Sequence, residues 1–194
     1  MSKRGLTKES VLDAAEQLVR QHGTEYLTTV TLARELGIKP ASLYNHISST
    51  EELRNQLALR AIHALSGTLS DAIQDRTRDE AFFALADAYR QFAHRNPGLY
   101  HLILKIPMEG DDTLTAALPD IVTPIVRLLD GFTLSPEEKN HWQRILRTVM
   151  HGFSTQELCG FFSHSNASRS ETYRLAVSTV LDGVKRAEEN HSHS

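Results

Sequence analysis

The stretch TTVTLARELGIKPASLYNHISSTEEL, residues 28–53, indicates two short helices joined by a tight turn. A hydroxyl of Thr28 or Thr29 can cap the first helix by accepting a backbone N–H. Gly37 marks the end of that helix, because glycine takes a positive φ without strain. Pro40 then begins a second short helix, at a position where its missing N–H costs nothing. This pattern predicts a helix-turn-helix, the motif whose second helix enters the major groove of DNA.

The second short helix is expected over residues 41–47. Leu43 and Ile47 are spaced i, i+4 and are predicted to pack inward, with Ile38 joining them from the turn. The remaining side chains are polar or small, and they can face base edges and phosphates. They are Lys39, Ala41, Ser42, Tyr44, Asn45 and His46.

Residues 37–53, GIKPASLYNHISSTEEL, resemble the recognition-helix signature of the TetR/AcrR family of bacterial regulators. Residues 6–37 resemble the first two helices of that family, so the resemblance runs without a gap from about Leu6 to Leu53. It implies that phosphates are contacted by Thr28, Thr29, Tyr44 and His46. Base readout then falls to Lys39, Ala41, Ser42 and Asn45, because lysine reaches guanine acceptors, asparagine pairs with adenine and alanine touches the thymine methyl group.

The sequence departs from the family pattern at Thr50, where the family usually has a lysine that opens the fourth helix. One cationic phosphate contact is therefore expected to be missing. The overall charge is also modest: residues 1–50 carry six basic and five acidic groups, while the whole chain carries a net charge of −3. The missing contact at Thr50 predicts a shallower salt dependence of DNA binding than is typical of the family, and the modest charge predicts that binding rests on local placement and on doubling by a dimer.

The bulk composition is that of an ordinary globular protein, with 40% hydrophobic and 23% charged residues. Cys159 is the single cysteine, so no disulfide can form within one chain. The N-terminal decapeptide has no apolar signal core, and no apolar run reaches the length of a membrane span. These observations predict a cytoplasmic protein. Lys3 and Arg4 form a short basic arm, which is either disordered or a DNA contact.

Strand-like alternation is scarce, and helical spacing with capping signals predicts an all-α fold of about nine helices. Ser49 with Glu52, and Ser135 with Glu138, have capping-box spacing. One helix is expected before the helix-turn-helix and six are expected after it. They are residues 7–22, 51–74, 78–94, 98–106, 114–129 with interruptions at Pro119 and Pro124, 136–162 and 171–187. The segment 107–112 is expected to be a loop, and the tail 189–194 to be disordered.

Two domains are expected: residues 1–50 as the three-helix DNA-binding domain, and residues 51–194 as a domain for effector binding and dimerisation. In the back half, residues 88–104 and 147–162 resemble the effector domain of the family branch that carries a Trp-His-Gly motif. Here Met150 replaces the tryptophan before His151 and Gly152. The resemblance implies a homodimer whose last two helices pair with their twins.

Aromatic and methionine residues in the back half are candidates to line a small-molecule pocket, since ligand sites are mostly apolar with few polar groups. Core packing is the alternative for each of them. The candidates are Tyr89, Phe92, Tyr100, Leu104, Met108, Trp142, Met150, His151 and Phe153. No metal site or cofactor is expected, because the histidines lack ligand spacing and there is no second cysteine. Ser154, His151 and Glu157 lack the nucleophile elbow of a hydrolase, so no enzyme is expected.

The sequence therefore favours a ligand-responsive DNA-binding transcriptional regulator. Its expected partners are a palindromic double-stranded operator, a small-molecule effector and a second copy of the chain, with no membrane partner. Repression is the commoner case in the family. The alternative from a different class is a helical adaptor that binds protein or lipid partners with little or no DNA binding, a hypothesis that the near-neutral front half favours.

Overall fold

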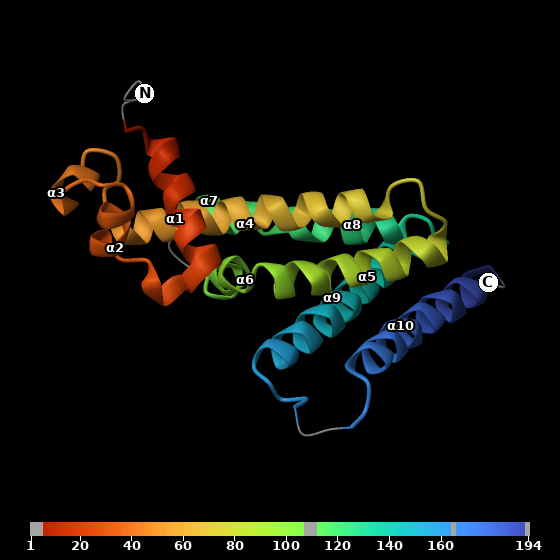
Figure 1. Cartoon of the computed structure of the whole chain (residues 1–194). Helices are drawn as coiled ribbons and strands as arrows, with labels where there is room; N and C mark the ends of the chain where they lie inside the picture. The colour runs from red at the N-terminus through yellow and green to blue at the C-terminus, as the bar shows by residue number, and fades with distance from the viewer. Residues whose placement is uncertain (1–5, 107–111, 164–165, 193–194) are drawn as a thin grey trace. The chain divides into compact units, whose positions relative to one another are not determined.

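The computed structural model describes residues 6–106, 112–163 and 166–192, and within these ranges every regular element is a helix (Figure 1). The all-α prediction is confirmed. The elements are α1 (Lys8–His22), the 3-10 helix η1 (Thr24–Tyr26), α2 (Thr29–Glu35), α3 (Pro40–Leu43), α4 (Thr50–Ile73), α5 (Arg78–Arg95), α6 (Pro97–Leu104), α7 (Asp112–Ala117), α8 (Pro119–Leu129), α9 (Pro136–Leu158) and α10 (Arg169–Ser192). None of the described helices is both long enough and apolar enough to cross a membrane.

The chain packs as two compact units. Among the described residues, the first unit is built from 6–62, 96–106 and 112–117, and the second from 63–95, 118–163 and 166–192. Helix α4 gives its first half to one unit and its second half to the other. The predicted functional domains, residues 1–50 and 51–194, do not follow from these packing units and stay a prediction.

In the first unit, α1 packs against α2, η1 and α6. Thr7 caps α1 through a reciprocal pair of hydrogen bonds with Ser10, which satisfies N–H groups that the first turn leaves free. Val19, on the buried face, meets α6 at Gly98. A Cβ at Gly98 would collide with the carbonyl oxygen of Val19, so a glycine is needed for this close approach.

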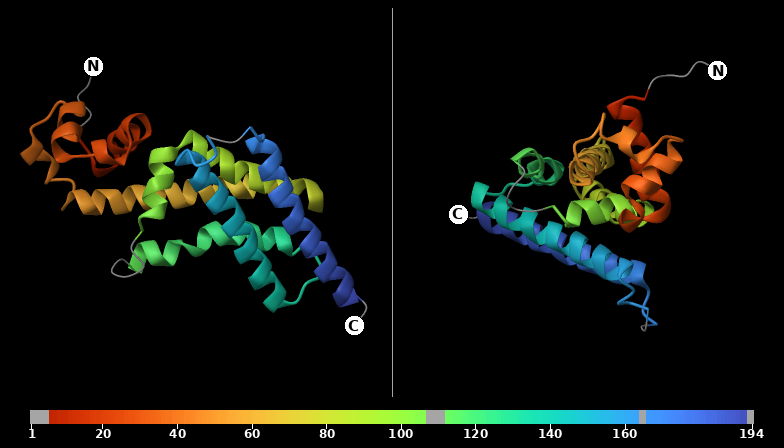
Figure 2. Two further views of the ribbon diagram at one scale, coloured as in Figure 1. Left: turned by 90° about the horizontal axis from the view of Figure 1, so that it is seen from below. Right: turned by 90° about the vertical axis from the view of Figure 1, so that its left-hand side faces the viewer.

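In the second unit, α5 is the central helix and packs against α8, α9 and α10. Seven of its side chains are buried, because helices pack against α5 on several sides. Helices α9 and α10 lie side by side (Figure 2). Their contact is close at Gly183, where a Cβ would overlap the ring of Trp142.

Several predicted helix boundaries are wrong. Helix α10 continues to Ser192, so residues 189–192 of the expected disordered tail are helical. Helix α9 ends at Leu158 rather than near residue 162, because Gly160 takes a φ of +76°. The expected helix 114–129 divides in two, since Pro119 begins α8, which keeps Pro124 in its interior. The prediction for the loop 107–112 falls almost wholly outside the described residues.

Candidate nucleic-acid interface

Thr28 is the capping residue of helix α2, which begins at Thr29. The Thr28 hydroxyl accepts a hydrogen bond from the Thr31 backbone N–H (3.1 Å), and the Thr31 hydroxyl accepts one from the Thr28 N–H (3.0 Å). This reciprocal arrangement fixes where the helix starts. Thr28 is exposed and Thr29, in the first turn, is half-buried. The partner residue Thr31 escaped the sequence reasoning, because capping boxes usually place Glu or Gln there.

The turn after α2 is a Schellman motif built on Gly37. This glycine has a φ of +66°. Its N–H donates to the Arg34 carbonyl (3.2 Å), and the Ile38 N–H donates to the Ala33 carbonyl (3.0 Å). The last carbonyls of α2 are thereby satisfied and the chain reverses toward Lys39. The predicted role of Gly37 is confirmed.

Helix α3 is shorter than predicted. Regular helix covers Pro40–Leu43 only, and the expected range 41–47 continues as a turn. The His46 and Ile47 N–H groups still donate to the Leu43 carbonyl (2.8 and 3.0 Å). No side chain caps the start of α3, and a four-residue helix has few internal hydrogen bonds, so tertiary packing decides its length.

The recognition segment has one buried side and one open side. Leu43 and Ile47 are buried at 0% and 3% exposure, as predicted, whereas Ile38 is half-buried. Tyr44 is 57% exposed. The other candidates for DNA contact divide in the same way. Lys39, Ala41 and Asn45 are exposed, while Ser42 and His46 are half-buried. The segment therefore presents donors and a small side chain outward on a fixed apolar support. The basic arm at Lys3 and Arg4 lies outside the described residues.

Ser48, which follows the recognition segment, is hydrogen-bonded to Glu52 at the start of α4. Ser49 caps this helix, accepting from the Glu52 N–H (2.9 Å), but the Glu52 carboxylate does not return to Ser49. It accepts instead from the N–H and hydroxyl of Ser48 (2.7 Å each) and from Lys8 Nζ (2.7 Å). The hydrogen bond from Lys8, followed by those from Ser48, lowers the pKa of Glu52 to about 2. The predicted capping box is thus only half correct, because one oxygen of the carboxylate accepts from Ser48 and the other from Lys8.

Arg60 of α4 pairs with three acidic groups on α1. Its guanidinium donates to Asp13 (2.8 Å), to Glu16 (3.3 Å) and to Glu9. Burial opposes the charge of Arg60, but these carboxylates outweigh it and raise its pKa. The network ties α1 to α4 and places one positive charge among three carboxylates, of which Glu9 and Asp13 remain exposed.

The predicted ligand residues are divided between the two units. Tyr100 and Leu104 lie on α6 of the first unit, at 1% and 38% exposure. The remaining described candidates belong to α5 and α9 of the second unit. They are Tyr89, Phe92, Trp142, Met150, His151 and Phe153. Met108 lies outside the described residues.

Within the second unit, contact is seen between Tyr89 and His151, whose hydroxyl and Nδ1 lie 3.3 Å apart. Burial, and then the charge of Arg147, lowers the pKa of His151, which favours a neutral imidazole. Met150 is fully buried, and Phe153 packs against Tyr173 with ring centroids 4.9 Å apart. The predicted role of these side chains in ligand binding stays a prediction.

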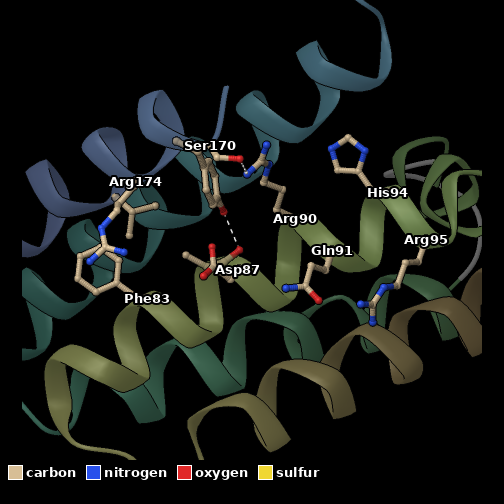
Figure 3. A pocket seen from close by; sticks show the side chains of 11 residues that line it. Phe83, Asp87, Arg90, Gln91, His94, Arg95, Ser170 and Arg174 are labelled. Atoms are coloured by element: carbon tan, nitrogen blue, oxygen red, sulfur yellow. Dashed lines mark hydrogen bonds between the residues drawn. The ribbon is translucent and has the colours of Figure 1, made fainter. Parts of the chain in front are cut away.

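Sequence reasoning missed a cavity in the second unit, between α5 and α10, with a volume of about 460 Å³ (Figure 3). None of the predicted ligand residues lines it. It lies between helices that are about eighty residues apart in the chain, and no local sequence pattern predicts which of their faces meet.

A capped helix, a glycine turn and a short helix with an open polar face together define a helix-turn-helix DNA-binding protein. The chain belongs to the TetR family. Residues 11–57 match the family described as "Bacterial regulatory proteins, tetR family", and residues 82–180 match the "Tetracyclin repressor-like, C-terminal domain". The protein is therefore a DNA-binding transcriptional regulator, and the matched domains are those of regulators rather than enzymes.

Known relatives agree with this assignment. The chain is 33% identical to the uncharacterized HTH-type transcriptional regulator YobS of Bacillus subtilis over 186 residues, which covers 95% of this chain and 96% of YobS. It is 34% identical to an uncharacterized HTH-type transcriptional regulator of Mycobacterium tuberculosis over 156 residues, covering 80% of this chain and 72% of the relative.

Solved structures share the fold. A protein of unknown function from Rhodococcus sp. RHA1 superposes with a TM-score of 0.79 at 22% identity, covering 94% of this chain and 97% of that one. A TetR variant from Acinetobacter baumannii AYE, solved in complex with minocycline, gives a TM-score of 0.69 at 15% identity, covering 95% of this chain and 99% of that one. TetR-family regulators bind DNA and small-molecule effectors, and TetR structures are dimeric.

Proposed function

We propose that the protein is a repressor that binds a palindromic operator as a homodimer and leaves it when a small molecule binds. One observation carries the proposal: the recognition segment exposes Lys39, Tyr44 and Asn45 on a support made by the buried Leu43 and Ile47. In this proposal, residues 1–50 read DNA, and residues 51–194 bind the effector and dimerise. The protein acts in the cytoplasm, where a bacterial regulator meets its DNA.

The division of labour on the DNA follows the chemistry of the side chains. Thr28, Thr29, Tyr44 and His46 donate hydrogen bonds to phosphate oxygens. The base edges are read by the remaining candidates, since an amide pairs with adenine and an ammonium with guanine. These are Lys39, Ala41, Ser42 and Asn45.

A homodimer through α9 and α10 is supported by their exposed apolar side chains. Leu175 on α10 is 67% exposed, and Ile145 and Leu158 on α9 are 42% and 38% exposed. Burying such side chains against a second copy stabilises a dimer by about 25 cal/mol per Å² of apolar area. Two recognition helices then read half-sites about 34–36 Å apart, or one DNA turn.

The test is selection of binding sites from random DNA, comparing the wild type with a Lys39→Ala/Asn45→Ala variant. The wild type is expected to enrich a palindrome, and the variant to lose or relax it, at about 1–3 kcal/mol per base contact. A matched control is Lys105→Ala/Asn166→Ala, which removes the same two groups from exposed positions outside the recognition segment and outside α9 and α10. Equal enrichment by the two double variants would contradict the assignment of the reading residues.

Leu175→Asp tests the dimer. The side chain is exposed in the protomer, so the substitution leaves the fold intact while it opposes pairing, whereas the neighbouring Val180 is 5% exposed and belongs to the core. Sedimentation is expected to give a monomer that no longer binds the operator. A Leu175→Asp protein that remains a dimer would refute the interface.

A further inference from the structure

The cavity between α5 and α10 has an apolar part. Phe83, Ala86, Tyr173 and Val177 line it, and Tyr173 is 1% exposed. The Tyr173 hydroxyl donates to the Ala86 carbonyl (2.6 Å), which fixes the aromatic ring against α5. The remaining lining residues are polar or charged: Asp87, Arg90, Gln91, His94, Arg95, Ser170 and Arg174.

Arg90 is held rigidly in the wall of this cavity. Its Nε and one terminal nitrogen donate to the two oxygens of Glu157 (2.7 Å each), and the Glu157 side chain is 2% exposed. His94 Nε2 lies 2.9 Å from the same carboxylate. The second terminal nitrogen of Arg90 lies 3.4 Å from the Ser170 hydroxyl (Figure 3). Glu157 thus orients Arg90 and leaves an N–H edge for another acceptor.

The lining also contains the guanidinium groups of Arg174 and Arg95. Arg174 lies over the Phe83 ring, 5.1 Å from its centroid, and both side chains are drawn together in Figure 3. Within the described part of the chain, neither Arg174 nor Arg95 forms an ion pair. The opposing charge in the lining is the carboxylate of Asp87. The lining is therefore cationic, even when Glu157 is taken to neutralise Arg90.

We propose that this cavity binds a small organic anion with an apolar body, which is the class of effector for this regulator. The apolar body packs on Phe83 and Val177, and the anionic group accepts from Arg174 beside Phe83, while Arg95, at the other end of the α5 lining, adds to the positive charge of the cavity. Guanidinium groups suit this role because they stay charged and present several donors. The regulatory part rests on the proposed function, since such a ligand bridges α5 to α10, a helix of the proposed dimer.

The probes are two fluorescent dyes with the same ring system, one anionic and one neutral: anilinonaphthalene sulfonate and phenylnaphthylamine. Each is titrated into the full-length protein without DNA. We expect saturable binding of the sulfonate with one site per protomer. An Arg95→Ala/Arg174→Ala variant is expected to bind the sulfonate about tenfold more weakly, equivalent to about 1.4 kcal/mol. Its affinity for the neutral dye should be unchanged.

Arg127→Ala/Arg186→Ala is the matched control. Arg127 on α8 and Arg186 on α10 are both exposed, and neither lines the cavity. This variant removes the same charge and is expected to bind the sulfonate as the wild type does. If the two double variants lose affinity equally, or if the sulfonate binds no better than the neutral dye, the anion site is refuted. Circular dichroism of each variant checks that the helices are intact.

Operator binding, measured separately, distinguishes this inference from the proposed function. Arginine-dependent dye binding together with operator release supports both. Arginine-dependent dye binding without operator release keeps the anion site but overturns its role as the effector site. Operator binding without arginine-dependent dye binding keeps the DNA-binding function and overturns the anion site.

Discussion

Lys8 Nζ lies 2.7 Å from the Glu52 carboxylate, and this ion pair joins the first turn of α1 to the first turn of α4. The same carboxylate accepts from the backbone and side chain of Ser48, directly after the recognition segment. One acidic group therefore fixes the end of that segment and positions α1 beside it. The contact adds to the support that the buried Leu43 and Ile47 give the recognition segment.

Glu52→Gln is expected to cost about 1–2 kcal/mol of the free energy of unfolding at pH 7, since charge-assisted hydrogen bonds are lost at a partly solvated site. The pKa of Glu52 is about 2 in the folded state against 4.5 for an ordinary glutamate. The contribution is therefore present above pH 4.5 and disappears as the pH falls toward 2. Urea unfolding at pH 7 and pH 3 should show the gap between wild type and variant narrowing in acid. A gap that widens in acid would contradict this account.

Glu157→Gln is expected to destabilise the second unit by about 3 kcal/mol, because it leaves Arg90 partly buried without its counter-charge. Arg90 is 19% exposed and donates twice to Glu157. Thermal unfolding measures the loss. Glu137→Gln on the exposed first turn of α9 is the control and should change stability by less than about 0.5 kcal/mol. Similar losses in both variants would argue against a special role for Glu157.

Gly98→Ala is expected to destabilise the protein by about 1–3 kcal/mol, because the added methyl group meets the Val19 carbonyl. Gly67→Ala is expected to stabilise the protein instead. A Cβ at Gly67 meets nothing within 4 Å, and alanine in a helix interior is favoured over glycine by about 1 kcal/mol. Denaturant midpoints of the two variants should shift in opposite directions. Equal shifts would mean that the α1–α6 contact relaxes easily.

Thr50→Lys is expected to steepen the salt dependence of operator binding, because it restores a cation at the start of α4. Each added phosphate contact changes the slope of log K against log salt by about 0.9. Fluorescence anisotropy at several salt concentrations measures the slope. Thr68→Lys, at an exposed position on the same helix, adds the same charge and should leave the slope unchanged. A steep slope in the wild type would count against a missing contact at Thr50.

Most of the helix-turn-helix could be predicted from the sequence. Thr28, Gly37 and Pro40 act on backbone groups within a few residues of themselves, so their effects are local and can be recognised from spacing alone. The burial of Leu43 and Ile47 follows from the same helical spacing. The length of α3 could not be predicted, since a helix so short is stabilised by its neighbours.

By itself the sequence determined the helical class, the cap and turn of the DNA-reading motif, and the family, because these depend on short-range hydrogen bonding and on motif spacing. Only the tertiary structure decided which side chains meet across the chain. Lys8 pairs with Glu52, Trp142 fills the space beside Gly183, and Arg90 pairs with Glu157. Such contacts depend on how helix faces pack in three dimensions, and residues far apart in the chain carry no local signal of their partners.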